Sequence, residues 1–164
     1  MNVTKMFKGR MQNLFLGLAS LFVITMVANA SEPLAQKLVD LNGKTVVLDS
    51  AKSKMLVVFW ATWCPDCREK LSDELVKLNK NPDVDLVAIS TESDGEKVKK
   101  FVEGEKIQLR VLRDPEKELR KQLKVTSVPH WAVYSRLDGA WKVVDSAPAF
   151  EKDRVLKALG LAKF

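Results

Sequence analysis

A continuous apolar run from Met55 to Trp60, followed closely by Cys64-Pro65-Asp66-Cys67, constrains the fold of this chain more than any other feature. Such a run is typical of a strand buried on both faces of a parallel sheet. After the cysteines, Leu71, Leu75 and Leu78 recur at the i, i+4 and i+7 spacing of one helix face. The pattern predicts a buried strand, a short connection and a helix whose first turn carries both cysteines.

The rest of the chain alternates between strand-like and helix-like segments. Further strands are expected at residues 45–48, 84–89, 107–112, 131–134 and 141–144, and further helices at 32–38, 96–102, 115–123 and 150–159. Asn42-Gly43 and Asp138-Gly139 are turn signals, and they predict one hairpin early in the chain and one late. Strands that alternate with helices predict an α/β fold with a parallel-centred sheet covered on both faces, which the late hairpin makes mixed.

Three of these elements carry specific expectations. Residues 107–112 alternate between apolar and polar side chains, which favours an edge strand. Asp114 is expected to cap a helix that begins at Pro115. Gly160 is expected to end the last helix, because glycine adopts the left-handed conformation common after a helix terminus.

The first thirty residues have the composition of a secretory signal peptide. Lys5, Lys8 and Arg10 precede an apolar stretch at 14–27, and Ala28-Asn29-Ala30 fits the small-x-small cleavage rule. We expect cleavage after Ala30, which leaves residues 31–164 as one domain. The alternative is an uncleaved anchor, but the apolar run is short of the roughly 20 residues that span a bilayer. Export to the periplasm or cell surface, where disulfides persist, is expected either way.

The charge of the chain does not favour a nucleic-acid partner. Of 27 basic residues, against 21 acidic ones, three lie in the signal segment, so the formal charge of +6 falls to +3 in the mature chain. The remaining lysines are interleaved with acids, as on a solvated surface, and no nucleic-acid-binding motif is present. We therefore expect no nucleic acid among the partners.

Cys64 and Cys67 are the only cysteines in the sequence. At the first turn of a helix the unpaired N–H groups and the helix dipole stabilise a thiolate. Cys64 is therefore expected to attack a partner disulfide, and Cys67, one turn later, to resolve the mixed disulfide. The pair predicts a thiol–disulfide oxidoreductase.

Other uses of two cysteines are weaker or remain open. A structural disulfide that closes so short a loop constrains the unfolded chain little. A zinc site needs more ligands than two cysteines and the single histidine, His130, provide. A non-enzymatic copper(I) carrier that uses the same two thiolates remains an alternative. No metal or cofactor is expected for the enzymatic reading.

Residues 59–69 (FWATWCPDCRE) resemble the thioredoxin superfamily, and most closely its exported TlpA-like branch, which includes the thiol reductases of cytochrome c maturation. Residues 41–48 resemble the opening hairpin of that branch, and 125–129 (VTSVP) resemble the loop that bears its cis-proline. The resemblance implies a thioredoxin-like fold, with a mixed central sheet flanked by helices, an N-terminal hairpin and a helix–strand insertion at 96–112.

The resemblance also implies site residues and partners. Cys64 and Cys67 would be catalytic, and Trp63, Pro65, Asp66, Val128 and Pro129 would contact the substrate, with a cis Val128–Pro129 bond. The substrates would be disulfides of exported proteins, such as apocytochrome c, and a membrane electron donor would keep the protein reduced. The negative charge of Asp66 favours reductase over oxidase activity.

Several residues depart from the family pattern. Val58 stands where thioredoxin has a buried aspartate, Leu71-Ser72-Asp73 where a proline often kinks the helix, and Ser127 where glycine is common. His130 replaces a threonine; we expect it to face a polar surface, with proton transfer as the alternative. Glu92 follows a core strand, and we expect a solvated loop acid, with proton shuttling as the alternative.

Overall fold

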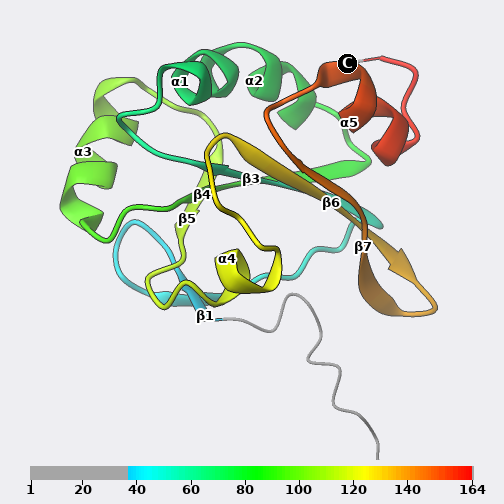
Figure 1. Ribbon diagram of the computed structural model, residues 1–164, viewed down its shortest axis with the longest axis horizontal. Coiled ribbons are helices and arrows are strands. Elements are labelled where there is room, and N and C mark those ends of the chain that lie inside the picture. The colour runs from blue at the N-terminus through cyan, green and yellow to red at the C-terminus, as the bar shows by residue number, and fades with distance from the viewer. Residues whose placement is uncertain (1–36, 164) are drawn as a thin grey trace, which may run out of the picture.

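The structure is a computed structural model that describes residues 37–163 (Figure 1). The predicted signal segment 1–30, its cleavage position and residues 32–36 of the predicted first helix lie outside the described residues. The elements in chain order are β1 (Lys37–Val39), β2 (Thr45–Val47), β3 (Lys54–Trp60), α1 (Pro65–Ser72), α2 (Glu74–Asn79), β4 (Val84–Ser90), α3 (Gly95–Gly104), β5 (Arg110–Arg113), α4 (Glu118–Gln122), β6 (His130–Leu137), β7 (Ala140–Pro148) and α5 (Lys152–Leu159). They form the predicted mixed α/β fold.

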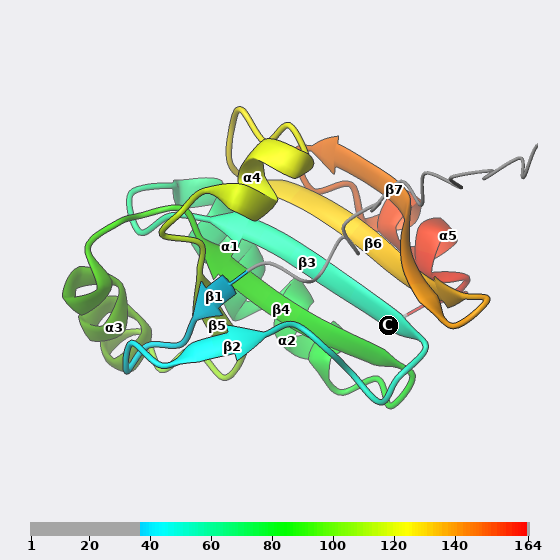
Figure 2. The ribbon, with the colours of Figure 1, turned by 90° about the horizontal axis from the view of Figure 1, so that it is seen from below.

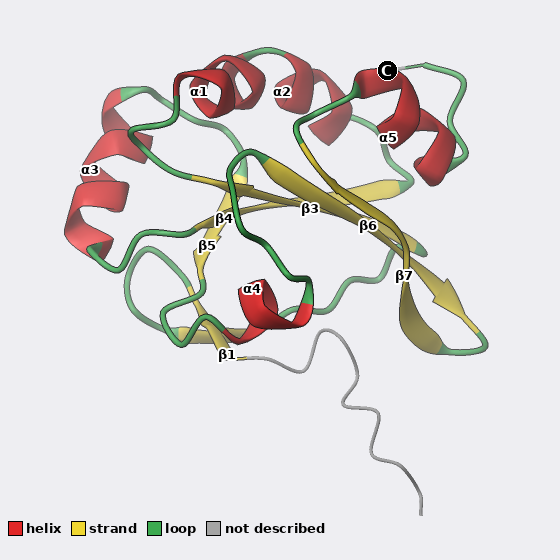
Figure 3. Ribbon diagram, in the orientation of Figure 1, coloured by secondary structure: helices red, strands yellow, loops and turns green. Residues whose placement is uncertain are grey.

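The strands form one sheet in the order β2-β1-β5-β4-β3-β6-β7. Helices α1, α2 and α5 lie on one face of the sheet and α4 lies on the other (Figures 1 and 3). Strand β3 lies in the interior of the sheet, because it pairs in parallel with β4 on one side and antiparallel with β6 on the other. Burial on both faces explains the continuous apolar run of β3. Leu56, Val58 and Trp60 join the core under α1 and α2, whereas Met55, Val57 and Phe59 join the core on the α4 side.

The strand register fixes where a site can form. Trp60 pairs with Ser90 at the carboxyl ends of β3 and β4, and Phe59 pairs with His130 at the amino end of β6. Figure 2 shows β4, β3 and β6 side by side across the middle of the sheet. The segment after β3, the segment after β4 and the segment before β6 therefore meet at one end of the sheet, where ligands of α/β proteins commonly bind.

The helix after the cysteines is broken, contrary to the prediction of one helix through Leu78. Helix α1 ends at Ser72, and α2 begins at Glu74, because Asp73 leaves the helical region with φ −122° and ψ −78°. The Ser72 hydroxyl donates to the carbonyls of Arg68 and Glu69, both at 3.0 Å, and so competes for the acceptors of the last turn. Buried leucines on both sides of the break keep the helical spacing, so periodicity alone does not reveal it.

Two further predictions for the inserted region and the start of the chain are wrong. Strand β5 is not an edge strand, because β1 pairs with it on the side away from β4, with Val39 opposite Arg113. Strand β2 is the edge instead. Lys37 and Leu38, predicted to end a helix, begin β1, since Leu38 is buried in the α4-side core.

The helix predicted at Pro115 begins later. Helix α4 starts at Glu118, and its N-cap is Lys117 in the left-handed conformation. Asp114 is buried, and its carboxylate accepts hydrogen bonds from the N–H groups of Glu118 (3.0 Å) and Arg120 (2.9 Å). Asp114 therefore accepts hydrogen bonds from backbone N–H groups of the first turn of α4, as a capping residue would. It does so from a position before the N-cap residue, Lys117.

The remaining hairpins and caps agree with the sequence. The turns at Asn42-Gly43 and Asp138-Gly139 join β1 to β2 and β6 to β7, both antiparallel. Gly160 ends α5 with a φ of 64°. Between residues 37 and 163, none of the helices has the length and apolar character needed to cross a bilayer.

Candidate active site

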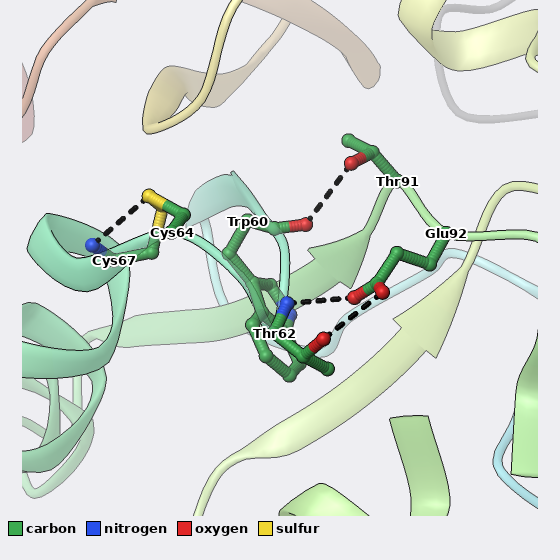
Figure 4. The surroundings of a disulfide bond; sticks show 6 residues. All are labelled: Trp60, Thr62, Cys64, Cys67, Thr91 and Glu92. Carbon is green, nitrogen blue, oxygen red and sulfur yellow. Dashed lines mark hydrogen bonds between the residues drawn. A yellow bond between two sulfur atoms is a disulfide. The ribbon is translucent and has the colours of Figure 1, made fainter. Parts of the chain in front are cut away.

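Cys64 and Cys67 are joined by a disulfide bond at the amino end of α1 (Figure 4). The Cys64 N–H donates to the Ala61 carbonyl at 3.1 Å, which folds the chain back just after β3. Cys64 is the N-cap of α1 and Pro65 follows at its first position, where no N–H is needed. The Cys67 N–H donates to Cys64 Sγ at 3.2 Å, so Cys64 Sγ occupies the end of the helix at which a negative charge is stabilised.

The disulfide is nearly buried while its sequence neighbours are exposed. Cys64 and Cys67 are 4% and 2% exposed, whereas Trp63 is 65% exposed. Pro65 and Asp66 are also exposed. The exposed surface around the disulfide is therefore formed in part by these three side chains.

The loop before β6 lies beside the disulfide end of β3. The Val128–Pro129 bond is cis, as expected. Val128 packs against both hydrophobic cores, including the one that contains the two cysteines. Within residues 37–163 the backbone N–H and C=O of Val128 make no hydrogen bond. They are therefore free to pair with the backbone of an extended chain laid beside this loop.

Glu92 ties the segment after β4 to the segment that carries the cysteines (Figure 4). Its carboxylate accepts from the Thr62 N–H at 2.6 Å and from the Thr62 hydroxyl at 2.9 Å, and it pairs with Lys97 Nζ at 2.7 Å. The Thr91 N–H donates to the Trp60 carbonyl at 2.9 Å beside them. Burial by itself would raise the pKa of Glu92, but the hydrogen bonds from Lys97 and Thr62 outweigh it and lower this pKa.

The expectation of a solvated acid at Glu92 is wrong, since its side chain is only 11% exposed. The sequence signal that identifies it is its position just past the carboxyl end of the strand beside β3. Thr62, the polar partner of Glu92, lies two residues before Cys64 and was not among the residues predicted from the sequence.

His130 is buried, at 6% exposure, and does not face a polar surface as expected. Its Nε2 lies 2.9 Å from the Ser146 hydroxyl, its ring packs edge-on against Phe59, and its buried Nδ1 has no hydrogen-bond partner between residues 37 and 163. Burial lowers the pKa of His130. Since Phe59 belongs to the α4-side core and the cysteines to the opposite one, His130 lies across the sheet from the disulfide.

Comparison with known proteins places this arrangement in a family. The Redoxin family model matches residues 26–138. Sporulation thiol-disulfide oxidoreductase A of Bacillus subtilis (strain 168) is 23% identical over 94 residues, which span 54% of this chain and 57% of that relative.

Two solved structures align over most of their own length. The exposed lipoprotein thioredoxin Etrx1 of Streptococcus pneumoniae TIGR4 is 30% identical, with a TM-score of 0.62 over 76% of this chain and 97% of that one. A secreted Mycobacterium tuberculosis disulfide oxidoreductase homologous to E. coli DsbE is 23% identical, with a TM-score of 0.59 over 80% and 98%. The chain thus belongs to the Redoxin family, within the thioredoxin superfamily.

Proposed function

We propose that this protein is an exported thiol–disulfide oxidoreductase that reduces protein disulfides through Cys64 and Cys67. The observation that carries the proposal is the position of the disulfide at the amino end of α1, where Cys64 Sγ accepts from the Cys67 N–H. A thiolate at Cys64 would receive the same hydrogen bond and the same helix dipole. Cys64 is therefore the attacking residue and Cys67 the resolving one.

The reaction transfers two electrons in two exchanges. The Cys64 thiolate attacks one sulfur of the partner disulfide, a mixed disulfide forms, and the other partner sulfur leaves as a thiolate that takes up a proton. Cys67 then loses its proton and attacks Cys64 Sγ, which closes the Cys64–Cys67 disulfide and releases the second partner thiol. An external dithiol donor must reduce the protein before the next cycle.

The partner is held by the surface around the disulfide. Trp63, Pro65 and Asp66 provide exposed contacts on one side of the disulfide. The unpaired Val128 backbone, ahead of Pro129, provides an edge to which an extended chain adds as a strand. Because this recognition uses backbone groups, it accepts many partner sequences, and exported proteins such as apocytochrome c fall within its range.

A disulfide-reduction assay tests the proposal. The reduced protein should speed the reduction of insulin by dithiothreitol, and Cys64→Ser should abolish that increase. If insulin is reduced no faster with the protein than with dithiothreitol alone, the proposed activity is overturned. A copper(I) titration of the same samples tests the carrier alternative, which requires tight copper binding by the dithiol without turnover.

The location and the direction of electron flow are tested in cells. Mass spectrometry of the exported form should give a first residue of Ser31, as the small-x-small rule predicts. Acid quenching and thiol labelling should find Cys64 and Cys67 mostly reduced, as a membrane electron donor would keep them. An intact membrane-bound N-terminus would contradict the cleavage, and a mostly oxidised pair would indicate an oxidase.

A further inference from the structure

A small basic pocket lies between α4 and the segment that leads to the Val128–Pro129 loop. It has a volume of about 190 Å³, and its lining residues are Lys117, Arg120, Lys121, Lys124, Val125 and Thr126. Arg120 and Lys121 belong to α4, whereas Lys117 precedes its first residue and Lys124 follows its C-cap, both with a left-handed backbone. The four cations come together because they line the same pocket. Leu119 points away from them into the core, and Val125 is buried at 8% exposure. The pocket thus combines a basic rim with an apolar residue in its lining.

The charges of this pocket have no acidic partner. Across residues 37–163, none of the four cations lies within 4.0 Å of a carboxylate oxygen. Like charges that are brought together in one pocket repel one another when nothing compensates them. An anion bound in the pocket would relieve this repulsion.

The pocket lies at the same end of the sheet as the disulfide. Arg120 Nη1 donates to the Thr91 carbonyl at 3.2 Å, and the Thr91 N–H donates to the Trp60 carbonyl at 2.9 Å. This chain of contacts links α4 to the carboxyl end of β3. Thr126 precedes Val128 by only two residues, and Figure 1 shows a loop that leads from α4 to the start of β6 with no helix or strand between them.

We propose that this pocket binds an acidic side chain of the partner polypeptide, close in sequence to the cysteine that is reduced. The inference rests on the proposed function, because the partner chain reaches the pocket by docking along Val128. Thr126 lines the pocket and lies two residues before Val128, so a partner chain docked along Val128 extends toward the pocket. The volume suits one side chain, and Val125 suits the methylene groups of glutamate. Charge complementarity therefore selects an acidic peptide segment.

Kinetics with matched peptides test the proposal. The substrates are disulfide peptides that differ by Glu, Gln or Lys at two, three or four residues from the reactive cysteine, with hydroxyethyl disulfide as a small neutral substrate. An exposed ion pair is worth up to about 1 kcal/mol, which is about a fivefold change in kcat/KM. The wild-type protein should prefer the Glu peptide to the Gln peptide by about that factor at low salt, and the preference should shrink at high salt.

Two sets of variants assign that preference to the pocket. Lys121→Gln/Lys124→Gln should bring the Glu-to-Gln ratio of kcat/KM close to one, and Lys121→Glu/Lys124→Glu should favour the Lys peptide. Lys80→Gln/Lys157→Gln changes the net charge equally. Lys80 precedes β4 and Lys157 lies near the carbonyl of Leu159 that Lys54 binds, so both lie at the far end of the sheet. This control should retain the preference.

Several outcomes would overturn the inference. One is the absence of a Glu preference at every peptide position, and another is its equal loss in the control. A third is anion binding without a Glu preference. If inorganic phosphate at constant ionic strength inhibits the wild type but not Lys121→Gln/Lys124→Gln, or if only the wild type binds phosphatidylglycerol vesicles, the pocket binds those anions instead. If hydroxyethyl disulfide is not reduced either, the proposed function fails and the inference fails with it.

Discussion

At the scale of single residues, Asp66 places a negative charge in the helix turn that carries the disulfide. Asp66 is exposed and lies between the two cysteines in sequence, in the first turn of α1. The amino end of the helix stabilises a thiolate at Cys64, and a neighbouring carboxylate opposes that effect. Strongly oxidising relatives depend on a highly stabilised thiolate, which favours their reduced form. Because Asp66 makes the thiolate less stable, it favours the disulfide and makes the dithiol a better electron donor.

Asp66→Asn should therefore raise the reduction potential. A shift of about 30 mV corresponds to 1.4 kcal/mol for two electrons, so one partly screened charge predicts about 10–20 mV. Asp83→Asn is a matched control, because Asp83 is exposed just before β4, at the far end of the sheet. A glutathione redox titration of the three proteins measures the shift. An unchanged or lower potential for Asp66→Asn would contradict the electrostatic argument.

His130 should make the folded protein sensitive to mild acid. Burial lowers its pKa below the ordinary value of 6.5, so between 6.5 and the folded pKa the unfolded chain binds more protons. The free energy of unfolding must then fall as the pH drops below 6.5. Urea midpoints of the oxidised protein at pH 7.5 and 5.5 measure this fall, which His130→Gln should reduce. Most carboxylates titrate at lower pH and contribute little in this window. An equal fall in both proteins would exclude His130 as its source.

At the scale of elements, the site depends on contacts between connections rather than within one helix. The Glu92 carboxylate joins the β4–α3 connection to Thr62 in the β3–α1 connection, and Lys97 of α3 completes the group. These bonds hold the chain two residues before Cys64, so they position the disulfide without touching it.

Glu92→Gln should destabilise the oxidised protein by about 1–3 kcal/mol, because hydrogen bonds to a charged group are lost and the amide nitrogen cannot accept. The Thr62 amide should also exchange its hydrogen faster. Glu103→Gln is the control, since Glu103 is exposed on α3 and forms no ion pair between residues 37 and 163, and it should change stability by less than about 0.5 kcal/mol. Urea unfolding and hydrogen exchange measure both effects. Unchanged protection of Thr62 would contradict the positioning role.

Most elements follow from local sequence, whereas their boundaries and neighbours depend on distant contacts. The β3 run and the Asn42-Gly43 turn determine their structures locally, so both were predictable. The break at Asp73 was not, because the leucines on both sides keep one periodicity. The place of β5 inside the sheet was not predictable either, since it depends on β1, whose partner strand lies over seventy residues away.

At the scale of the whole molecule, three separate segments meet at one end of the sheet. They are the disulfide after β3, Glu92 after β4 and the cis-proline loop before β6. The cysteines and the loop were predictable, because each has a sequence motif. The environment of Glu92 was predicted wrongly and its partner Thr62 was missed, because their contact joins two separate connections. The basic pocket was not predicted, because its lysines were interpreted as part of a solvated surface.

The most direct measurement of the central claim is the formation of a mixed disulfide by single-cysteine variants. Reduced Cys67→Ser and Cys64→Ser proteins are mixed with insulin, quenched with acid and analysed by intact mass spectrometry under non-reducing conditions. The Cys67→Ser variant should form a lasting adduct through Cys64, because no resolving thiol remains. The Cys64→Ser variant should form little, since Cys67 lies further into α1 than the N-cap position of Cys64, where a thiolate is stabilised. Equal adduct formation by the two variants, or none by either, would contradict the assignment of Cys64 as attacker and Cys67 as resolver.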